Sequence, residues 1–173
     1  MSYTTIPGMF LETTKTNSNR SAYFEKKKGE WKEYKFGEVR DIVEKFAAGL
    51  ASLGLSKDDK VAIQSNNCPH WALSDYAISS IGAVSVTVYP TLISSQIKYI
   101  IDDSDTQYVI TQDQSQTDKV LKFIQDSPKL KGIIAMDNTH DPAKNIISTY
   151  QPNPSAAAKG FPASLSLNTT MSE

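Results

Sequence analysis

The sequence predicts an α/β fold, a layered parallel sheet flanked by helices, with a small β-hairpin near the N-terminus. Residues 60–111 carry most of this prediction, because short runs rich in Val and Ile alternate there with segments whose apolar residues recur every three or four positions. The joins between them are short and rich in Gly, Pro, Asn and Asp, which favour turns. Two consecutive strand–helix–strand units with right-handed crossovers place their strands in parallel, in one sheet that helices cover.

The chain before this unit is expected to form a helix and a hairpin. Residues 6–16 predict a short helix with Met9 and Phe10 on one face. Residues 22–25 and 31–34 predict the two arms of a hairpin, and we expect their aromatic side chains to supply its buried face. The tip holds the run Lys26-Lys27-Lys28, which we interpret as a solvated tip rather than a phosphate or lipid-headgroup contact, because three glutamates surround it.

The clearest helical period in the chain lies between Gly37 and Leu53. Val39, Ile42, Val43, Phe46, Ala47, Leu50 and Leu53 form one broad apolar stripe. Most charged residues fall outside this stripe, which indicates a helix packed on a sheet, and Gly54 ends it. Lys35 occupies the cap position before this helix and cannot accept a hydrogen bond from the helix amides, so we expect a cap weaker by about 1 kcal/mol.

The elements of the central unit can be bounded from the sequence. We expect strands at residues 60–65, 83–88 and 107–111, one helix from about Pro69 to Gly82, and a second helix capped by Ser94.

Beyond the central unit the sequence predicts one more helix and strand, and then a change of character. Residues 114–126 predict a helix and residues 132–136 a fourth strand. Residues 138–173 hold four prolines, an alanine run and a Ser/Thr/Asn-rich end with little periodicity. We therefore divide the chain into an α/β unit at residues 1–137 and an irregular or disordered tail at residues 138–173.

A family resemblance is carried by short motifs that keep a fixed order along the chain. They are Phe36-Gly37-Glu38, Phe46-Ala47-Ala48-Gly49-Leu50, Leu53-Gly54-Leu55, Ser65-Asn66-Asn67-Cys68-Pro69-His70-Trp71, Ala77, Gly82-Ala83-Val84, Val88-Tyr89-Pro90-Thr91, Tyr99-Ile100 and Asp103-Ser104. Together these residues resemble the N-terminal region of the fatty acyl-CoA synthetases, the long-chain branch of the adenylate-forming ligases. The resemblance fades after about Asp137.

The resemblance implies that the chain is an N-terminal fragment of a long-chain fatty acid–CoA ligase. The intact enzyme would activate a fatty acid with ATP and Mg²⁺ to an acyl-adenylate and then form the acyl-CoA. The family's Ser/Thr/Gly-rich loop ending in Pro-Lys, its Tyr-Gly-x-Thr-Glu motif, its downstream Asp and its C-terminal Lys have no matching run here. We therefore expect no catalytic, cofactor-binding or metal-ligating residue in this chain, and we expect the fragment alone to be inactive.

The reactive side chains receive structural interpretations. Cys68 and His70 stand two apart, but no orienting partner is identified, so we interpret Cys68 as a packing residue at the start of a helix. His140 and Asp141 do not complete metal-ligand spacing with His70. The cluster Asp102, Asp103 and Asp105 is interpreted as the polar end of an apolar helix rather than a calcium loop.

Two sets of residues have a functional alternative. Trp71 and Tyr76 could line a fatty-acid tunnel, although we favour a place in the core. Asn66-Asn67 and Tyr89-Pro90-Thr91 follow two strands at the edge where open parallel sheets bind ligands. For the second motif we favour a structural role, in which Pro90 fixes a turn, Tyr89 packs and Thr91 forms a polar rim.

Composition and charge limit the kinds of partner and the cellular location that we expect. The net charge is −1 with both signs interspersed, so we expect no nucleic-acid partner. The single cysteine suits a cytoplasmic protein, the N-terminal residues do not resemble a secretory signal, and no apolar stretch reaches the length of a membrane span. A peripheral contact with a membrane remains open for the intact enzyme.

The sequence leaves two alternatives to a ligase fragment. One is a stand-alone flavodoxin-like binding or interaction module without catalysis, and the other is assembly with a separately encoded remainder. The module predicts a small-molecule crevice at residues 66–67 and 89–91. The fragment predicts an exposed apolar patch where the remainder of the ligase chain packs, and self-association at high concentration.

Overall fold

A five-stranded parallel sheet forms the centre of the molecule, in a computed structural model that describes residues 5–137 and 146–148. Side by side, the strands are β4 (Val84–Val88), β3 (Lys60–Gln64), β5 (Tyr108–Thr111), β6 (Gly132–Ala135) and β7 (Ile146–Ser148). The chain goes from β3 to β4 on one side and then crosses back to place β5 on the other side of β3. The predicted α/β class and its parallel sheet are confirmed.

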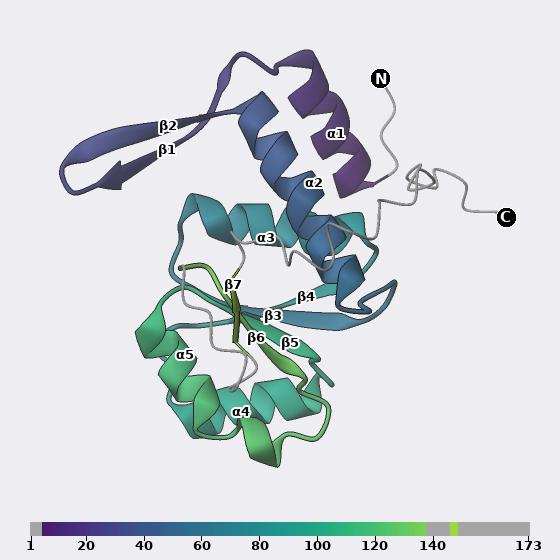
Figure 1. Ribbon diagram of the computed structural model, residues 1–173, viewed down its shortest axis with the longest axis vertical. Coiled ribbons are helices and arrows are strands. Elements are labelled where there is room, and N and C mark those ends of the chain that lie inside the picture. The colour runs from purple at the N-terminus through teal and green to yellow at the C-terminus, as the bar shows by residue number, and fades with distance from the viewer. Residues whose placement is uncertain (1–4, 138–145, 149–173) are drawn as a thin grey trace, which may run out of the picture.

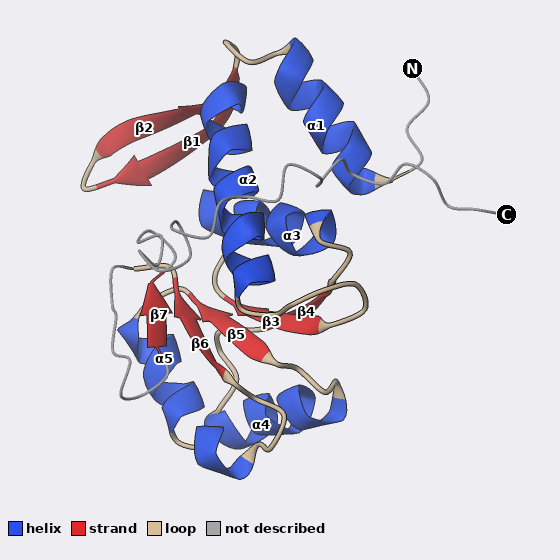
Figure 2. Cartoon of the chain, turned by 45° about the vertical axis from the view of Figure 1, so that its right-hand side comes forward, coloured by secondary structure: helices blue, strands red, loops and turns tan. Residues whose placement is uncertain are grey.

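Helices cover both faces of this sheet (Figure 1). The described helices are α1 (Ile6–Thr16), α2 (Phe36–Ser52), α3 (Pro69–Ser80), α4 (Ser94–Asp103) and α5 (Gln114–Leu121), with a 3₁₀ turn at Ile124–Asp126. Figure 2 shows α2 and α3 above the strands and α4 and α5 below them. No helix in the described part of the chain is long and apolar enough to cross a membrane.

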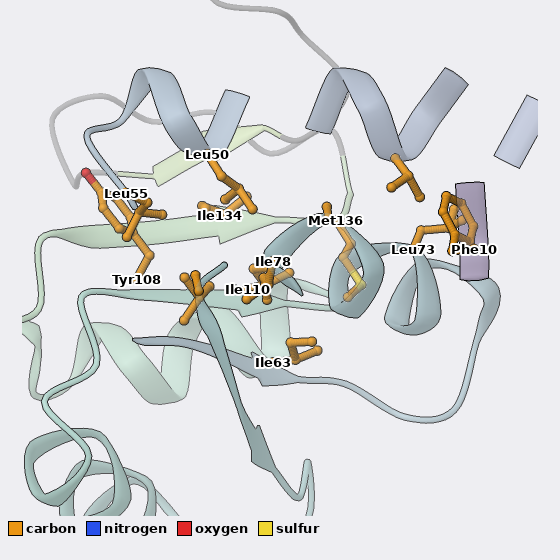
Figure 3. Close-up of a cluster of buried hydrophobic side chains, with 14 of the residues drawn as sticks. Phe10, Leu50, Leu55, Ile63, Leu73, Ile78, Tyr108, Ile110, Ile134 and Met136 are labelled. Atoms are coloured by element: carbon orange, nitrogen blue, oxygen red, sulfur yellow. The ribbon is translucent and has the colours of Figure 1, made fainter. Parts of the chain in front are cut away.

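Each face of the sheet has its own core, because side chains alternate between the faces along every strand. On β3, Val61 and Ile63 point to the face covered by α2 and α3, and Ala62 points to the face covered by α4 and α5. Figure 3 shows the first core, in which Ile63, Ile110 and Ile134 come from three neighbouring strands. Burial on both faces explains why these strands are continuous apolar runs.

The N-terminal hairpin forms as predicted, but its faces differ from the prediction. Strands β1 (Ser21–Lys27) and β2 (Glu30–Lys35) pair in antiparallel fashion around Lys28 and Gly29, both of which have positive φ. Tyr34 is only 3% exposed, whereas Phe24 and Trp31 are 59% and 67% exposed. The prediction that the aromatic residues supply the buried face was therefore wrong for Phe24 and Trp31, because the alternation turns them to the opposite side from Tyr34.

At the start of α2, backbone carbonyls accept the hydrogen bonds that a capping hydroxyl would otherwise accept. The Lys35 side chain makes no cap hydrogen bond, as predicted. The amides of Phe36 and Gly37 instead donate to the carbonyls of Arg20 and Ser18, at 3.0 and 2.9 Å. A Cβ at Gly37 would lie 3.2 Å from the Ser18 carbonyl oxygen, so a residue without a side chain suits this close approach.

Two predicted boundaries were wrong. Ile93, not Ser94, is the N-cap of α4, and its amide donates to Gln96 Oε1 at 3.3 Å. The predicted helix at residues 114–126 ends at Leu121, because Phe123 leaves helical geometry (φ −133°) and is buried in the core on that face.

Strand β7 lies within residues 138–173, where we predicted an irregular or disordered tail. Residues 146–148 pair in parallel with residues 133–135 of β6. The other residues of that range lie outside the described part of the chain.

Candidate functional site at the carboxyl edge of the sheet

The strand order reverses between β3 and β5, and open parallel sheets bind ligands at the carboxyl ends of the strands at such a point. Helix α3 follows β3 onto one face, and α5 follows β5 onto the other, so the two loops diverge where the strand order reverses. The predicted residues Asn66 and Asn67 follow β3 at this edge, and both are exposed. Gln112 and Asp113 follow β5.

A side chain from one of these loops bridges to the other. Gln112 Oε1 accepts hydrogen bonds from the Asn66 backbone amide at 2.8 Å and from Asn66 Nδ2 at 3.0 Å. The Ser65 hydroxyl lies 3.4 Å from the same oxygen. The loops that follow β3 and β5 are therefore joined directly by hydrogen bonds.

A buried polar pair lies beneath this bridge. Gln64, the last residue of β3, is fully buried, and its Nε2 donates to Oε1 of Gln116 on α5 at 2.9 Å. Gln64 Oε1 has no hydrogen-bond partner among the described residues. The hydroxyls of Thr111 and Thr117 form a second buried contact at 2.7 Å. None of these four residues was predicted from the sequence, although Gln64 and Thr111 are polar residues at the ends of two apolar strands.

The second predicted motif faces solvent. Strands β3 and β4 are neighbours through Gln64 and Val88, so the loop at residues 89–91 lies beside the loop at residues 65–67. Tyr89 is 77% exposed, which makes the expectation that it packs wrong. The reason is that β4 is the edge strand of the sheet, which the sequence does not reveal. The Pro90 carbonyl accepts a hydrogen bond from Lys119 of α5, and this bond holds the loop against the helix.

Cys68 and His70 occupy the first turn region of α3 and contact different partners. Cys68 is the N-cap residue, and its Sγ lies 3.6 Å from the Ser65 hydroxyl. The His70 ring meets Tyr34 edge-on, with 6.2 Å between the ring centroids. Burial lowers the pKa of His70, and the carboxylate of Glu25 only partly offsets this effect. A packing role for Cys68 remains a prediction.

The two aromatic residues of α3 that could line a fatty-acid tunnel pack against the core. Trp71 and Tyr76 are both partly buried there, and the Tyr76 ring stacks on Phe10 with the ring centroids 4.3 Å apart. A cavity of about 60 Å³ lies beside Tyr76, lined by residues of α1, α2 and the hairpin. It is far smaller than the roughly 300 Å³ or more that pockets for organic ligands occupy.

The aspartates at the end of α4 pair with lysines. Asp102 accepts a hydrogen bond from Lys98, which lowers the pKa of Asp102, and Asp105 lies 2.7 Å from Lys129 Nζ. Within the described residues, no three His, Cys, Asp or Glu side chains are grouped to hold a metal ion. His140 and Asp141 lie outside those residues.

Comparisons with known proteins identify what this fold is similar to. A family model described as AMP-binding enzyme matches residues 10–166. The chain is 29% identical over 146 residues to the long-chain-fatty-acid–CoA ligase ACSBG1 of Rattus norvegicus, a match that covers 84% of this chain and 20% of the rat protein. It is 29% identical over 106 residues to the long-chain-fatty-acid–CoA ligase FadD15 of Mycobacterium bovis, covering 61% of this chain and 18% of that protein.

A solved structure shows the same fold. The acetoacetyl-CoA synthetase of Streptomyces lividans superposes with a TM-score of 0.74 at 19% identity, over 83% of this chain and 24% of that one. The chain thus spans about a fifth of the length of the curated relatives that it matches.

Proposed function

Since the chain belongs to the AMP-binding enzyme family, we propose that it is the N-terminal part of a long-chain fatty acid–CoA ligase. The observation that carries this proposal is the family match across residues 10–166, combined with a relative of which the match covers only 20%. The motif order along residues 36–104 supports the same assignment.

The intact enzyme would activate a fatty acid with ATP to give an acyl-adenylate and pyrophosphate, and would then transfer the acyl group to CoA. Mg²⁺ and donors that surround the phosphates are needed for the first step. The described residues do not fit this requirement, because they hold neither a group of metal ligands nor a glycine-rich loop. That this chain holds no catalytic, cofactor-binding or metal-ligating residue remains our prediction.

The carboxyl edge of the sheet supports the ligase over the stand-alone module. The strand order is the one found in flavodoxin-like folds, so topology alone would suit either. The side chain of Asn66, which the module requires at its crevice, is instead hydrogen-bonded to Gln112 in the loop after β5. The family match adds to this argument. Assembly with a separately encoded remainder stays compatible with the ligase assignment.

Exposed apolar side chains in β4, in α4 and in the loop between them support a surface for the remainder of the ligase chain. We call this set the β4–α4 surface, and its members are Val84, Tyr89, Ile93 and Tyr99. The strand itself is Val-Ser-Val-Thr-Val, without a charge or proline that would discourage pairing at a free edge. We expect the isolated chain to self-associate through this surface at high concentration, as light scattering and a dye for exposed apolar surface would report.

We propose a cytoplasmic location, which the single unpaired cysteine supports. The substrates proposed for the intact enzyme are a fatty acid, ATP and CoA.

The decisive experiment is to sequence the source DNA beyond codon 173 and to translate all three frames. A Ser/Thr/Gly-rich loop ending in Pro-Lys, followed by the later ligase motifs, is the expected result. ATP–pyrophosphate exchange with a fatty acid should then occur with the extended chain and not with residues 1–173. Exchange by the isolated chain, or a continuation without these motifs, would contradict the proposal.

A further inference from the structure

The β1–β2 hairpin projects from the body of the molecule, as Figure 1 shows. One side of it carries Tyr34, which is buried against the rest of the protein. The opposite side carries Phe24 and Trp31, each more than half exposed. We call this opposite side, with Phe24, Lys26, Trp31 and Glu33, the outer face of the hairpin.

A lysine accompanies the exposed tryptophan on the outer face. Lys26 and Trp31 are directly paired across the two strands, and Lys26 Nζ lies 5.8 Å from the centroid of the Trp31 ring. Lys28 stands at the tip, where its positive φ and that of Gly29 close the turn. Aromatic side chains and ammonium groups are thus combined on a hairpin that projects from the body of the molecule.

The sequence favours a solvated tip because three glutamates surround the lysines, but in the structure two of these glutamates have partners other than Lys26 and Lys28. Glu25 belongs to the inner side, where Tyr34 Oη donates to it at 3.0 Å and Lys27 Nζ lies 3.1 Å away. Glu33 accepts a hydrogen bond from the Ser21 hydroxyl at the base of the hairpin. Residues 21–35 contain five lysines and three glutamates, a net charge of +2 in a chain whose total is −1.

Lysines beside the exposed aromatic side chains favour a lipid partner over a protein partner. Lysine is depleted from the cores of protein interfaces, because its ammonium group must lose water there. At an anionic bilayer the same groups contact lipid phosphates, while Trp and Phe settle at the boundary between headgroups and acyl chains. We propose that the outer face of the hairpin docks on an anionic lipid surface, with Phe24 and Trp31 inserted and Lys26 and Lys28 at the phosphates.

This inference does not depend on the proposed ligase function, because its test measures binding of residues 1–173 to vesicles and no enzymatic activity. The probe is co-sedimentation with phosphatidylcholine–phosphatidylserine vesicles at low salt, with pure phosphatidylcholine vesicles as the comparison. We expect binding to the anionic vesicles that weakens as salt is added. Lys26→Gln and Lys28→Gln should each weaken it about fivefold.

The matched variants separate the outer face from other exposed aromatic residues. Phe24→Ala with Trp31→Ala should weaken vesicle binding at least about tenfold. Tyr89→Ala with Tyr99→Ala removes two aromatic rings that are at least as exposed, from a different surface, and should leave binding unchanged. All four positions are exposed, so circular dichroism should show the same fold for both double variants.

Fluorescence provides a second readout, because the chain has only two tryptophans. In a Trp71→Phe background the emission comes from Trp31 alone, and we expect a blue shift and protection from acrylamide when the anionic vesicles are added. No sedimentation with these vesicles, or equal binding of the Phe24/Trp31 double variant, would overturn the proposal. Protection of Trp31 that grows with protein concentration before any vesicles are added would also overturn it, because a second copy would then cover this face.

Discussion

The buried glutamine pair beneath the candidate site makes an asymmetric prediction about stability. Gln116→Leu leaves the amide of Gln64 without its hydrogen-bond partner in a fully buried position. An unsatisfied buried polar group costs about 1–3 kcal/mol, and Gln64 Oε1 already has no partner in the described part of the chain. We therefore expect Gln116→Leu to lower the free energy of unfolding by about 2 kcal/mol.

Removing both amides should be much less harmful than removing the acceptor alone. Replacing both partners of a buried hydrogen bond by apolar side chains of similar shape is close to neutral. The double variant Gln64→Leu with Gln116→Leu should then be more stable than Gln116→Leu, with a coupling energy of at least about 1 kcal/mol. For a chain of this size, 2 kcal/mol corresponds to a change in melting temperature of roughly 4–8 °C.

Equilibrium urea denaturation of the four members of this cycle measures the coupling. Gln125→Leu is the matched control, because Gln125 is an exposed glutamine in the neighbouring 3₁₀ turn, and it should change stability little. If Gln116→Leu is as stable as the parent, or if the two single effects simply add, the hydrogen bond between Gln64 and Gln116 does not stabilise the fold. A changed urea slope would show that the variant no longer unfolds in a comparable way.

Three further predictions concern other parts of the fold. Lys35→Ser supplies a hydroxyl that can accept from the first turn of α2, so urea denaturation should show a gain of about 0.5–1 kcal/mol that Lys35→Ala does not give. Ile63→Ala opens a cavity in a fully buried position and should cost about 2–5 kcal/mol in the same assay. Burial lowers the pKa of His70, so the unfolded chain binds a proton more readily than the folded chain. The free energy of unfolding should therefore fall as the pH drops below the ordinary value of 6.5, and denaturation of His70→Phe at a series of pH values should lack this component.

Local pattern was sufficient to predict most of the elements. The bounds of α1 and the start of α3 at Pro69 agree with the prediction. The stripe on α2 also agrees, since Val39, Val43 and Leu50 are buried. In each case the apolar spacing and the flanking Pro or Gly act within a few residues, so the signal is contained in the local sequence.

The features that were not predicted depend on contacts between residues far apart in the sequence. The bond between Gln112 and Asn66 joins residues 46 positions apart, and nothing near either residue indicates the other. Tyr89 was expected to pack, but β4 lies at the edge of the sheet. That position depends on how the whole chain crosses over, which the residues near Tyr89 do not indicate. The hairpin arms were predicted, but which of their two faces meets α3 depends on the register and on tertiary contacts.

The two exposed apolar surfaces can be assigned to different partners by the charges that accompany them. Between Val84 and Ile101 there is one lysine, Lys98, and it is paired with Asp102. Lys119 of α5 also reaches the loop after β4, where it is bonded to the Pro90 carbonyl. The segment that carries the β4–α4 surface is thus poor in charge, as the cores of protein interfaces are, whereas the outer face of the hairpin combines its aromatic rings with lysines. The assignment demands that the two double variants have opposite effects. Loss of Tyr89 and Tyr99 should reduce self-association in light scattering and spare vesicle binding, and loss of Phe24 and Trp31 should do the reverse. If either variant reduces both properties, the two surfaces act as one and the separation by charge is wrong.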